Sequence, residues 1–425
     1  MPFRLPASPL SFLLLTVAAA SSVRAADWPQ WRGPARTGIS QEQRLAPSWP
    51  TDGPPLAWKI TGLGEGFSTP SVADGKLFVM GNRKAKDATE TDVEQEYVLA
   101  YDIRSRGKEL WSTVIGPVRH KGAGYAGPRS TPTVDGDRLY AVGLNGDLVC
   151  LDVRSGAIRW RHNFVAEFEG TIPTWGYTES PLVDGPWVVC TPGGGKATFA
   201  AFDKLTGKQI WGSEFGERAG YASIVPAVID DVKQYVQFMH GAVVGVDARN
   251  GVPLWRYEAP ANGTANCSTV LVAGNKIFAA SGYGTGGGAA DIKKDGDKFA
   301  ADEAFFTKKM KNHHGGMVLV DGFLYGSDDP GILTCIELAT GEDKWQERAP
   351  GKCSLIYFAG GLMITRSEKG KVCLVRVSPE KCEVLGEFEQ PDRSDKPSWP
   401  HPVVADGMLY LRDQGTLLVY DVRAK

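Results

Sequence analysis

The sequence predicts an all-β fold: an eight-bladed β-propeller of four-stranded antiparallel blades that is closed by an N-terminal strand. Two repeated patterns and the composition support this prediction. The 51 glycines and 27 prolines together account for 78 of the 425 residues, and both residue types disfavour the interior of helices. The hydrophobic fraction is 42% and the charged fraction is 23%. These values are typical of a globular protein, which excludes disordered and collagen-like chains.

The first pattern consists of a strand, a tight turn and a second strand, and it occurs eight times along the chain. Its turns carry pairs such as Asp74-Gly75 and Asp135-Gly136, which are typical of tight hairpins. Clear copies begin at Ser68, Ser130, Glu179 and His401, and weaker copies begin at Ser223, Ser268, Gly316 and Ser354. Their spacing of about 40 to 60 residues is that of four-stranded propeller blades, so we expect eight blades.

The second pattern is Asp/Glu-x3-Gly-x3-Trp, which predicts the third and fourth strands of a blade. The acidic side chain can bond the backbone of the turn, the glycine accepts a positive φ, and the tryptophan fills the space between adjacent sheets. Four copies end at Trp160, Trp211, Trp255 and Trp345, and the copy from Asp102 to Trp111 is one residue longer. Two blades end instead near Phe305 and Phe388. We interpret the glycine-rich residues 282–288 as the start of a long loop within a blade.

The last copy has no fourth strand of its own, because the chain stops soon after Asp421. Residues 55–60 lie before the first copy and resemble a fourth strand with Trp58 at its end. We therefore expect them to pair into the final blade and close the ring, which removes exposed sheet edges. The predicted organisation is a signal peptide over 1–25, an N-terminal extension packing on the propeller over 26–54, and a single propeller domain over 55–425.

Residues 1–25 have the pattern of a secretory signal. Arg4 precedes an apolar run over 10–20, and Val23 and Ala25 place small residues before the expected cleavage point. The alternative is a membrane anchor, but the run is shorter than the ~20 residues that a membrane span needs. No cysteine lies near residue 26, so lipid attachment is not expected. The sequence thus predicts a periplasmic or secreted protein without a membrane span.

The charges and cysteines limit the partners and the covalent structure. With 47 basic and 49 acidic residues the net charge is -2, which gives no attraction to nucleic acid. We expect a monomer. The seven cysteines are an odd number, so at least one thiol is free. Cys150, Cys335 and Cys373 lie in apolar strand-like runs, which favours core packing over the alternative of disulfides.

Candidate site residues lie in the connections that enter the innermost strands, since these connections surround one mouth of a propeller channel. A mouth with such aromatic and ionisable groups can hold a small ligand, a peptide strand or an ion. The alternative is that these loops are solvated and their polar groups satisfy one another. The candidate ligand-binding residues are Arg129, Trp175, Tyr177, Glu179, Tyr221, Asn266, His313, His314, Lys352, Trp399 and His401, with Phe67, His120 and Tyr125 beside them. Because neighbouring residues on a strand point to opposite faces, only one of His313 and His314 is expected to face the channel.

The Asp-x3-Gly-x3-Trp repeats resemble the PQQ-like (pyrroloquinoline quinone) propeller repeat family of the quinoprotein alcohol dehydrogenase-like superfamily. This family includes quinoprotein alcohol dehydrogenases and the outer-membrane protein assembly factor BamB. The segments DWPQWRGPARTGIS, WGYTESPLVDG and MKNHHGGMVLVDGFLYG also look like secreted propellers of planctomycete-type bacteria. The resemblance implies that Glu179 and Asn266 match a Glu and an Asn that hold calcium beside the quinone in the dehydrogenases. The adjacent cysteine pair that contacts the quinone in those enzymes has no counterpart here.

Two functions follow from these observations and the resemblance. We favour an exported, non-catalytic binding or protein-interaction scaffold of the cell envelope, similar to BamB. Its partner would be an envelope or extracellular protein, or a small ligand at the propeller face. The alternative is a dehydrogenase that depends on PQQ and calcium, with Glu179 and Asn266 as metal ligands and Trp175 as a stacking surface.

Overall fold

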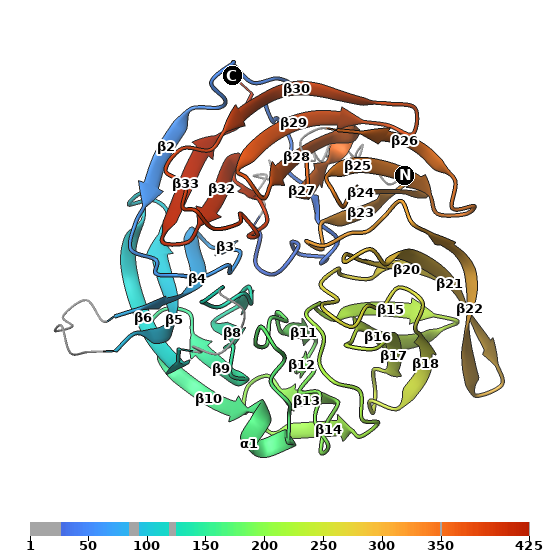
Figure 1. The fold of residues 1–425 in the computed structure, drawn as a ribbon. Coiled ribbons are helices and arrows are strands. Elements are labelled where there is room, and N and C mark those ends of the chain that lie inside the picture. Colours follow the sequence, from blue (N-terminus) through green and yellow to red (C-terminus); the bar gives the residue numbers. More distant parts are fainter. Residues whose placement is uncertain (1–26, 85–92, 119–124, 349–350, 425) are drawn as a thin grey trace, which may run out of the picture.

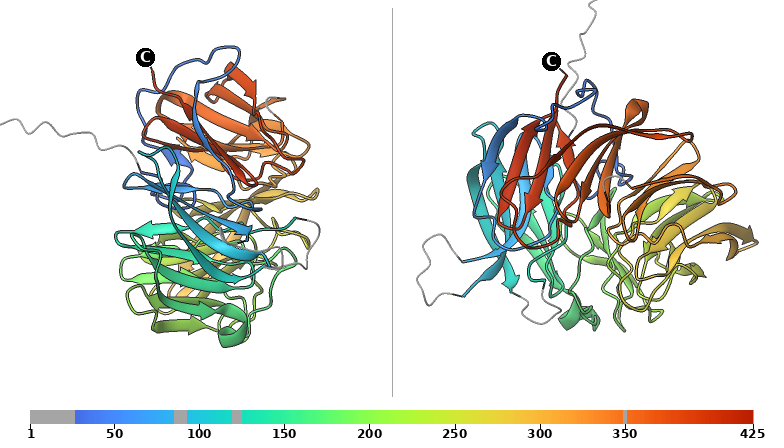
Figure 2. Two further views of the ribbon diagram at one scale, coloured as in Figure 1. Left: turned by 90° about the vertical axis from the view of Figure 1, so that its left-hand side faces the viewer. Right: turned by 45° about the horizontal axis from the view of Figure 1, so that its top comes forward.

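The computed structural model describes residues 27–84, 93–118, 125–348 and 351–424. The predicted signal peptide and His120 therefore lie outside the described residues. Eight antiparallel sheets stand around one central axis (Figure 1). Seen from its edge, the ring is a thick disc (Figure 2). The predicted eight-bladed propeller is thus confirmed. No helix in the described residues is long and apolar enough to cross a membrane.

In seven blades the strands follow one another in chain order from the innermost strand to the outermost, and the eighth blade takes its outermost strand from the N-terminal part of the chain. The first blade contains β3 (Ser71–Ala73), β4 (Lys76–Arg83), β5 (Gln95–Asp102) and β6 (Lys108–Pro117), and the second contains β7 (Thr133–Asp135), β8 (Arg138–Val142), β9 (Asp147–Asp152) and β10 (Ile158–Asn163). The third blade contains β11 (Leu182–Asp184), β12 (Trp187–Cys190), β13 (Phe199–Asp203) and β14 (Gln209–Ser213). The fourth contains β15 (Val225–Ile229), β16 (Val232–Phe238), β17 (Val243–Asp247) and β18 (Pro253–Tyr257).

The fifth blade contains β19 (Leu271–Ala273), β20 (Lys276–Ser281), β21 (Gly286–Asp295) and β22 (Lys298–Thr307). The sixth contains β23 (Met317–Val320), β24 (Phe323–Asp328), β25 (Ile332–Glu337) and β26 (Asp343–Glu347). The seventh contains β27 (Cys353–Phe358), β28 (Leu362–Ser367), β29 (Lys371–Val377) and β30 (Cys382–Glu389). The eighth contains β31 (Val403–Ala405), β32 (Met408–Asp413), β33 (Thr416–Asp421) and β2 (Leu56–Ile60). A short strand, β1 (Ile39–Ser40), and one short helix, α1 (Phe164–Phe168), complete the described elements together with a 3-10 turn at Ala359–Gly361.

The ring is closed by β2, as predicted. This strand runs antiparallel to β33, with Trp58 opposite Val419 and Ile60 opposite Leu417. Ile60 also packs against the first blade, because a Cβ on Gly107 would lie 2.5 Å from Ile60 Cγ1. The segment therefore joins the last blade to the first by main-chain pairing on one side and side-chain packing on the other.

The contacts between neighbouring blades explain the second repeat. Gly156 has a φ of +74°, and a Cβ placed on it would lie 2.6 Å from Trp111 Cδ2 of the preceding blade. The indole Nε1 of Trp111 donates to the carbonyl of Val153 at 3.0 Å, and Asp152 accepts from the backbone N–H of Ser155 at 2.9 Å. The same close approach occurs for the pairs Gly207 with Trp160, Gly251 with Trp211, and Gly341 with Phe305. Each glycine thus adopts the positive φ that its turn requires and leaves space for an aromatic ring of the neighbouring blade.

Gly156→Ala is expected to lower the free energy of unfolding by about 2 to 4 kcal/mol, because a positive φ and a crowded aromatic neighbour both penalise the methyl group. Gly136 is a matched control: its φ is +60°, and nothing lies within 4 Å of a Cβ there. Gly136→Ala should therefore lose only about 1 kcal/mol, the conformational cost alone. Urea denaturation of the two variants measures the difference. Equal losses would contradict this explanation of the repeat.

Part of the N-terminal extension enters the centre of the ring (Figure 1). We call residues 27–40 the plug. Trp28 forms an antiparallel bridge with Val72 of β3, and Ile39 pairs in parallel with Tyr357 of β27. The carbonyl of Pro29 accepts from Val134 N at 2.8 Å. The extension was expected to pack on the propeller, and the structure shows that this part of it lies against the innermost strands.

Two buried arginines fasten the plug to distant blades. Arg32 donates to the carbonyl of Gly315 at 2.9 Å and to that of Met317 just after it. Arg36 donates to the carbonyls of Ser180 at 2.8 Å and Pro181 at 3.0 Å. Because backbone carbonyls at the inner edge of the ring are cut off from water, these guanidinium groups supply donors that the sheets cannot provide.

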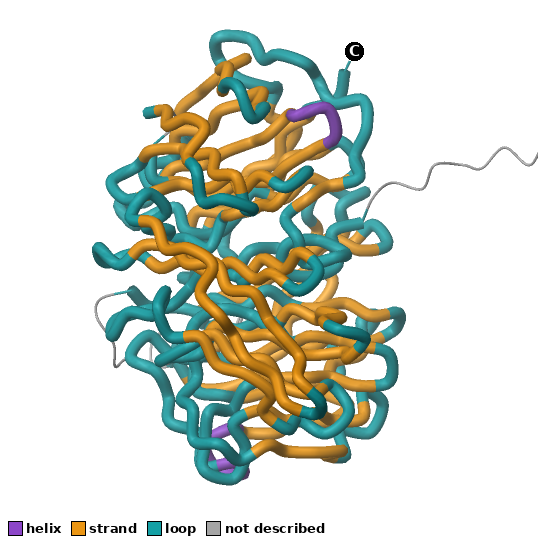
Figure 3. The backbone as a smooth tube through the Cα atoms, turned by 90° about the vertical axis from the view of Figure 1, so that its right-hand side faces the viewer, coloured by secondary structure: helices purple, strands orange, loops and turns teal. Residues whose placement is uncertain are grey.

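Two further expectations are settled by the fold. All seven cysteines are free, and Cys150, Cys335 and Cys373 are fully buried, which confirms core packing. The interpretation of residues 282–288 as the start of a long loop is wrong. Strand β21 begins at Gly286 and forms with β22 a long hairpin (Figure 3). Small residues are needed there, because a Cβ on Gly288 would lie 2.1 Å from the Tyr257 hydroxyl of the neighbouring blade.

Candidate functional site

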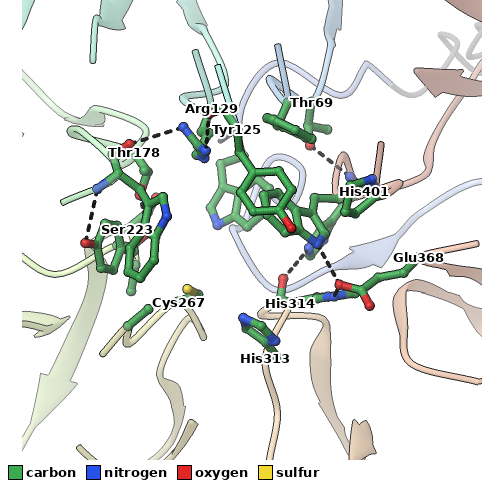
Figure 4. A pocket seen from close by; sticks show the side chains of 18 of the residues that line it. Thr69, Tyr125, Arg129, Thr178, Ser223, Cys267, His313, His314, Glu368 and His401 are labelled. Atoms are coloured by element: carbon green, nitrogen blue, oxygen red, sulfur yellow. Dashed lines mark hydrogen bonds and ion pairs between the residues drawn. The ribbon is translucent and has the colours of Figure 1, made fainter. Parts of the chain in front are cut away.

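A cavity of about 430 Å³ lies on the loop face of the ring, where the connections into the innermost strands converge. All eight blades and the plug contribute to its wall (Figure 4). Its aromatic lining residues are Trp31, Phe67, Tyr125, Trp175, Tyr221, Tyr283 and Trp399, and its ionisable ones include Arg129, Cys267, His313, His314, Lys352, Glu368 and His401. A concave site with mostly apolar walls and a few polar groups is the usual form of a ligand pocket.

Hydroxyl groups at the start of the repeat units link neighbouring blades around the cavity. Ser180 Oγ accepts from Thr131 N at 2.9 Å, and Ser223 Oγ accepts from Ser180 N at 2.9 Å. Thr69 Oγ1 accepts from His401 N at 2.9 Å and so joins the last blade to the first. These bonds explain why serine or threonine begins so many copies of the first pattern. They also fix the loops that carry the cavity wall.

One side of the cavity is an aromatic cluster beneath a cation. The ring centroid of Trp399 lies 4.7 Å from that of Phe67 and 4.8 Å from that of Tyr125. The guanidinium carbon of Arg129 lies 5.1 Å from the Phe67 centroid, within the range of a cation–π contact. The sequence-predicted Trp175 and Tyr221 form a second pair, with centroids 5.6 Å apart.

The charge of Arg129 is held by backbone carbonyls. Its guanidinium donates to Tyr125 O at 2.8 Å, Trp175 O at 3.1 Å and Gly127 O at 3.2 Å. In the part of the chain that the structure describes, it forms no salt bridge with a carboxylate. Burial lowers the pKa of Arg129 to about 10, which leaves the group positively charged at neutral pH. An anionic group in the cavity would therefore meet a cation that no carboxylate of the described residues contacts at salt-bridge distance.

Another side of the cavity contains a paired set of ionisable groups. Lys352 Nζ lies 2.5 Å from His313 Nδ1, and His314 Nε2 lies 2.7 Å from Glu368 Oε1. Burial and the Lys352 ammonium group lower the pKa of His313 to about 4, so its ring is neutral at pH 7 and accepts from the lysine. Burial opposes ionisation of Glu368, but the hydrogen bonds from His314 and Trp399 lower its pKa to about 2 overall.

His401 connects this set to the plug. Its Nε2 lies 2.8 Å from the carbonyl of His314, to which it donates, and its ring centroid lies 4.4 Å from that of Trp31. Burial, followed by the nearby charge of Arg32, lowers the pKa of His401 to about 3. His401 is therefore a neutral donor that holds the loop at residues 313–314 in place.

The expectation that only one of the two adjacent histidines faces the channel is wrong. Both His313 and His314 line the cavity, and their ring centroids lie 5.6 Å apart. They lie in the bent loop before β23 rather than on a strand, so the alternation of side chains along a strand does not apply to them.

Three other predicted residues lie outside the cavity wall. Glu179 is buried, and its carboxylate accepts from Thr191 N at 2.6 Å and from Thr191 Oγ1 at 2.5 Å. Asn266 donates to the carbonyl of His240 at 2.7 Å, and the Tyr177 hydroxyl donates to the carbonyl of Pro192 at 2.8 Å. The structure brings Arg129, Trp175, Tyr221, His313, His314, Lys352, Trp399 and His401 to the cavity and leaves Tyr177, Glu179 and Asn266 out.

These contacts test whether the chain's residues fit a quinone–calcium pair. A calcium ion takes six to eight oxygen ligands, yet both Glu179 oxygens are engaged with Thr191. The amide oxygen of Asn266 accepts from Asn262 N at 3.0 Å. Burial raises the pKa of Glu179 to about 7, which disfavours the anionic ligand that calcium requires. In this conformation the two residues do not fit a calcium site.

Sequence reasoning missed several residues of the wall. Tyr283 and Glu368 follow the second strand of a blade, and connections at that point lie on the same face as those entering the first strand. Including these second-to-third strand connections would have found both. Trp31 carried no such signal, because nothing in the sequence places the plug inside the ring. Cys267, next to Asn266 in the connection before β19, also lines the cavity.

The propeller fold of this chain is also found in known proteins. A family model described as outer membrane protein assembly factor BamB matches residues 94–347, more than half of the chain. Among solved structures, BamB from Moraxella catarrhalis has a TM-score of 0.56 at 15% identity and covers 87% of this chain and 99% of its own. A quinohemoprotein alcohol dehydrogenase from Comamonas testosteroni has a TM-score of 0.64 at 15% identity, over 94% of this chain and 81% of its own. At such identities these structures share the fold.

A curated relative matches a smaller part of the chain. The polyvinylalcohol dehydrogenase of a Pseudomonas species is 24% identical over 152 residues, which is 29% of this chain and 22% of that protein. This chain thus matches about a fifth of that relative's length. The family model covers far more of the sequence. The chain therefore belongs to the PQQ-like repeat propeller family that the model of outer membrane protein assembly factor BamB describes.

Proposed function

We propose that this chain is a non-catalytic binding protein of the cell envelope, similar in role to BamB. Its axial cavity would take a small ligand or a projecting segment of a partner protein. The observation that carries the proposal is the composition of the cavity wall: the Phe67–Trp399 cluster and the Trp175–Tyr221 pair face a space beside Arg129, a cation with no salt bridge to a carboxylate of the described residues. Such a wall suits a ligand with an apolar or aromatic body and a negative group.

The chemistry of the remaining wall residues supports binding rather than turnover. The thiol of Cys267 is protonated at neutral pH, because burial raises its pKa to about 12, and a thiol of this kind is a poor nucleophile. The hydroxyls of Ser180 and Ser223 accept backbone hydrogen bonds within the wall. The imidazole of His313 and the carboxylate of Glu368 already have charged or hydrogen-bonded partners.

The location belongs to the same proposal. The predicted signal over 1–25 supports export to the periplasm or beyond, and the family model's description refers to outer-membrane assembly. An envelope protein is therefore the partner class that we propose, together with a small ligand.

The second candidate is a quinoprotein dehydrogenase. It is supported by the likeness to the quinohemoprotein alcohol dehydrogenase fold, by the polyvinylalcohol dehydrogenase match, and by aromatic walls beside the cations Arg129 and Lys352, which would suit a flat, negatively charged quinone. The engaged state of Glu179 and Asn266 counts against it. Bound PQQ would supply the redox chemistry there, and this chain's residues would orient it.

Two assays on the full chain separate these functions. Immobilised protein is mixed with envelope extract, and retained proteins and small molecules are identified by mass spectrometry. We expect a retained species that Trp175→Ala and Trp399→Ala lose, whereas Phe299→Ala, in the β21–β22 hairpin outside the cavity, keeps it. Retention that does not depend on either cavity tryptophan would contradict the proposal. In the second assay, saturable binding of PQQ with calcium and dye-linked alcohol oxidation, both abolished by Glu179→Ala, would establish the dehydrogenase instead.

A further inference from the structure

Three ligand atoms meet at one side of the cavity. His313 and His314, from the loop before β23, and Glu368, from the turn between β28 and β29, each offer one atom, and these atoms all lie within 4.8 Å of one another. Two imidazole nitrogens and one carboxylate oxygen are a donor set of divalent transition metals such as zinc. The neighbouring cavity leaves space for a fourth ligand.

The side chain of His314 is a second, independent observation, because one of its ring nitrogens is buried without a hydrogen-bond partner among the described residues. This side chain is only 2% exposed. Its Nε2 contacts Glu368 Oε1 at 2.7 Å, whereas Nδ1 is the buried nitrogen without a hydrogen-bond partner among the described residues. Buried polar atoms are seldom left unpaired, because each costs free energy.

The ammonium group of Lys352 lies among the donor atoms of His313 and Glu368. Its ammonium nitrogen lies 2.5 Å from His313 Nδ1, 3.3 Å from Asp329 Oδ1 and 3.7 Å from Glu368 Oε1. A positive charge therefore already stands among the donors. The lysine side chain is 23% exposed, so it has access to the cavity if another cation takes its place.

Other residues hold the donors in position. Trp399 Nε1 donates to Glu368 Oε1 at 2.7 Å, and His401 donates to the carbonyl of His314 at 2.8 Å. Asn312 Oδ1 accepts from Gly315 N at 2.9 Å and shapes the loop that carries both histidines. Outer hydrogen bonds of this kind orient ligands and raise metal affinity.

We propose that His313, His314 and Glu368 bind a divalent transition metal of the zinc class, and that Lys352 competes with the metal for the same donors. When the metal enters, the ammonium group withdraws into the cavity. The affinity is then set by the balance between the two cations. The site goes beyond the binding function proposed above and requires neither a protein partner nor a quinone.

The test is a titration of the purified full chain with Co²⁺, followed by its visible absorption bands, and with Zn²⁺ in competition with a chromophoric chelator. We expect one ion per chain. His314→Ala and Glu368→Gln each remove a proposed ligand and should weaken binding by at least about 100-fold, the upper end of the loss seen when only an outer hydrogen-bond partner is removed. Lys352→Met should tighten it by at least about tenfold, because a like charge is removed from beside a dication. Misfolding cannot imitate a gain in affinity, so this variant keeps the test decisive.

The chain offers a matched control. His162 and Glu167 also form a histidine–carboxylate pair, at 2.5 Å, but on the outer side of the second blade. His162→Gln should leave the affinity unchanged. Absence of binding at millimolar Zn²⁺, or binding that neither His314→Ala nor Lys352→Met alters, would overturn the proposal. So would calcium competing as strongly as zinc, since nitrogen donors disfavour calcium. None of these results depends on the extract assay, so the two proposals can fail separately.

Discussion

A chain that lacks residues 27–60 is expected to lose the single cooperative unfolding transition of the propeller. The deletion removes β2, which leaves β33 as an unpaired edge, and it removes the contact of Ile60 with Gly107 across the ring closure. It also removes both buried arginines of the plug. An open edge and an uncovered inner surface favour association between chains.

Thermal unfolding followed by circular dichroism measures this effect, with light scattering to detect aggregation. We expect the midpoint to fall by at least about 5 °C, since the loss of several kcal/mol moves a domain of this size by that order. A chain that begins at Asp27 is the control and should unfold as a single transition. If the chain without 27–60 melts like the control, the ring does not depend on its N-terminal closure.

Arg32→Met is expected to lower the free energy of unfolding by about 3 to 5 kcal/mol, the range for breaking a buried polar network. The side chain is 2% exposed, and its loss would remove the hydrogen bonds that it donates to the buried carbonyls of Gly315 and Met317. Burial lowers the pKa of Arg32 to about 9, which shows that keeping the charge there is costly. The carbonyl hydrogen bonds must offset that cost, so removing them outweighs the relief of removing the charge.

Urea denaturation compares this variant with Arg32→Lys and with Arg104→Met. A lysine keeps the charge but cannot reach the same set of carbonyls, so Arg32→Lys should also be destabilised by at least about 2 kcal/mol. Arg104 is exposed in a surface turn, and its replacement should change stability by no more than about 0.5 kcal/mol. An Arg32→Met protein as stable as the Arg104→Met protein would show that the plug is held by other contacts.

The blades could be predicted from the sequence because each one is defined locally. The turn pairs and the Asp-x3-Gly-x3-Trp spacing lie within a few tens of residues, and the structure shows why they recur: Gly156 must adopt a positive φ and also admit the Trp111 ring. The closure by residues 55–60 was predictable for the same reason, since the segment has the form of the strand that the last blade lacks.

The cavity was predictable in outline only. Residues of the entering connections could be assigned to one face by topology alone, and eight of the eleven candidates line the cavity. Their orientation could not be deduced, because it depends on contacts with other blades. Glu179 turns away to Thr191 within its own blade, whereas Glu368 turns toward His314 of a neighbouring one. The plug was hidden from sequence reasoning because Arg32 and Gly315 are 283 positions apart.

The long separation between the plug and its partners has a consequence for synthesis. At typical translation rates, roughly 15 to 60 s pass between the appearance of Arg32 and that of Gly315, and β33 follows later still. During that time the guanidinium group of Arg32 lacks its partners Gly315 and Met317, although Ser180 and Pro181, the partners of Arg36, are made about halfway through the interval. Contacts between residues so far apart in the chain slow folding, so we expect Arg32 to dock onto the carbonyls of Gly315 and Met317 only after most of the ring has formed.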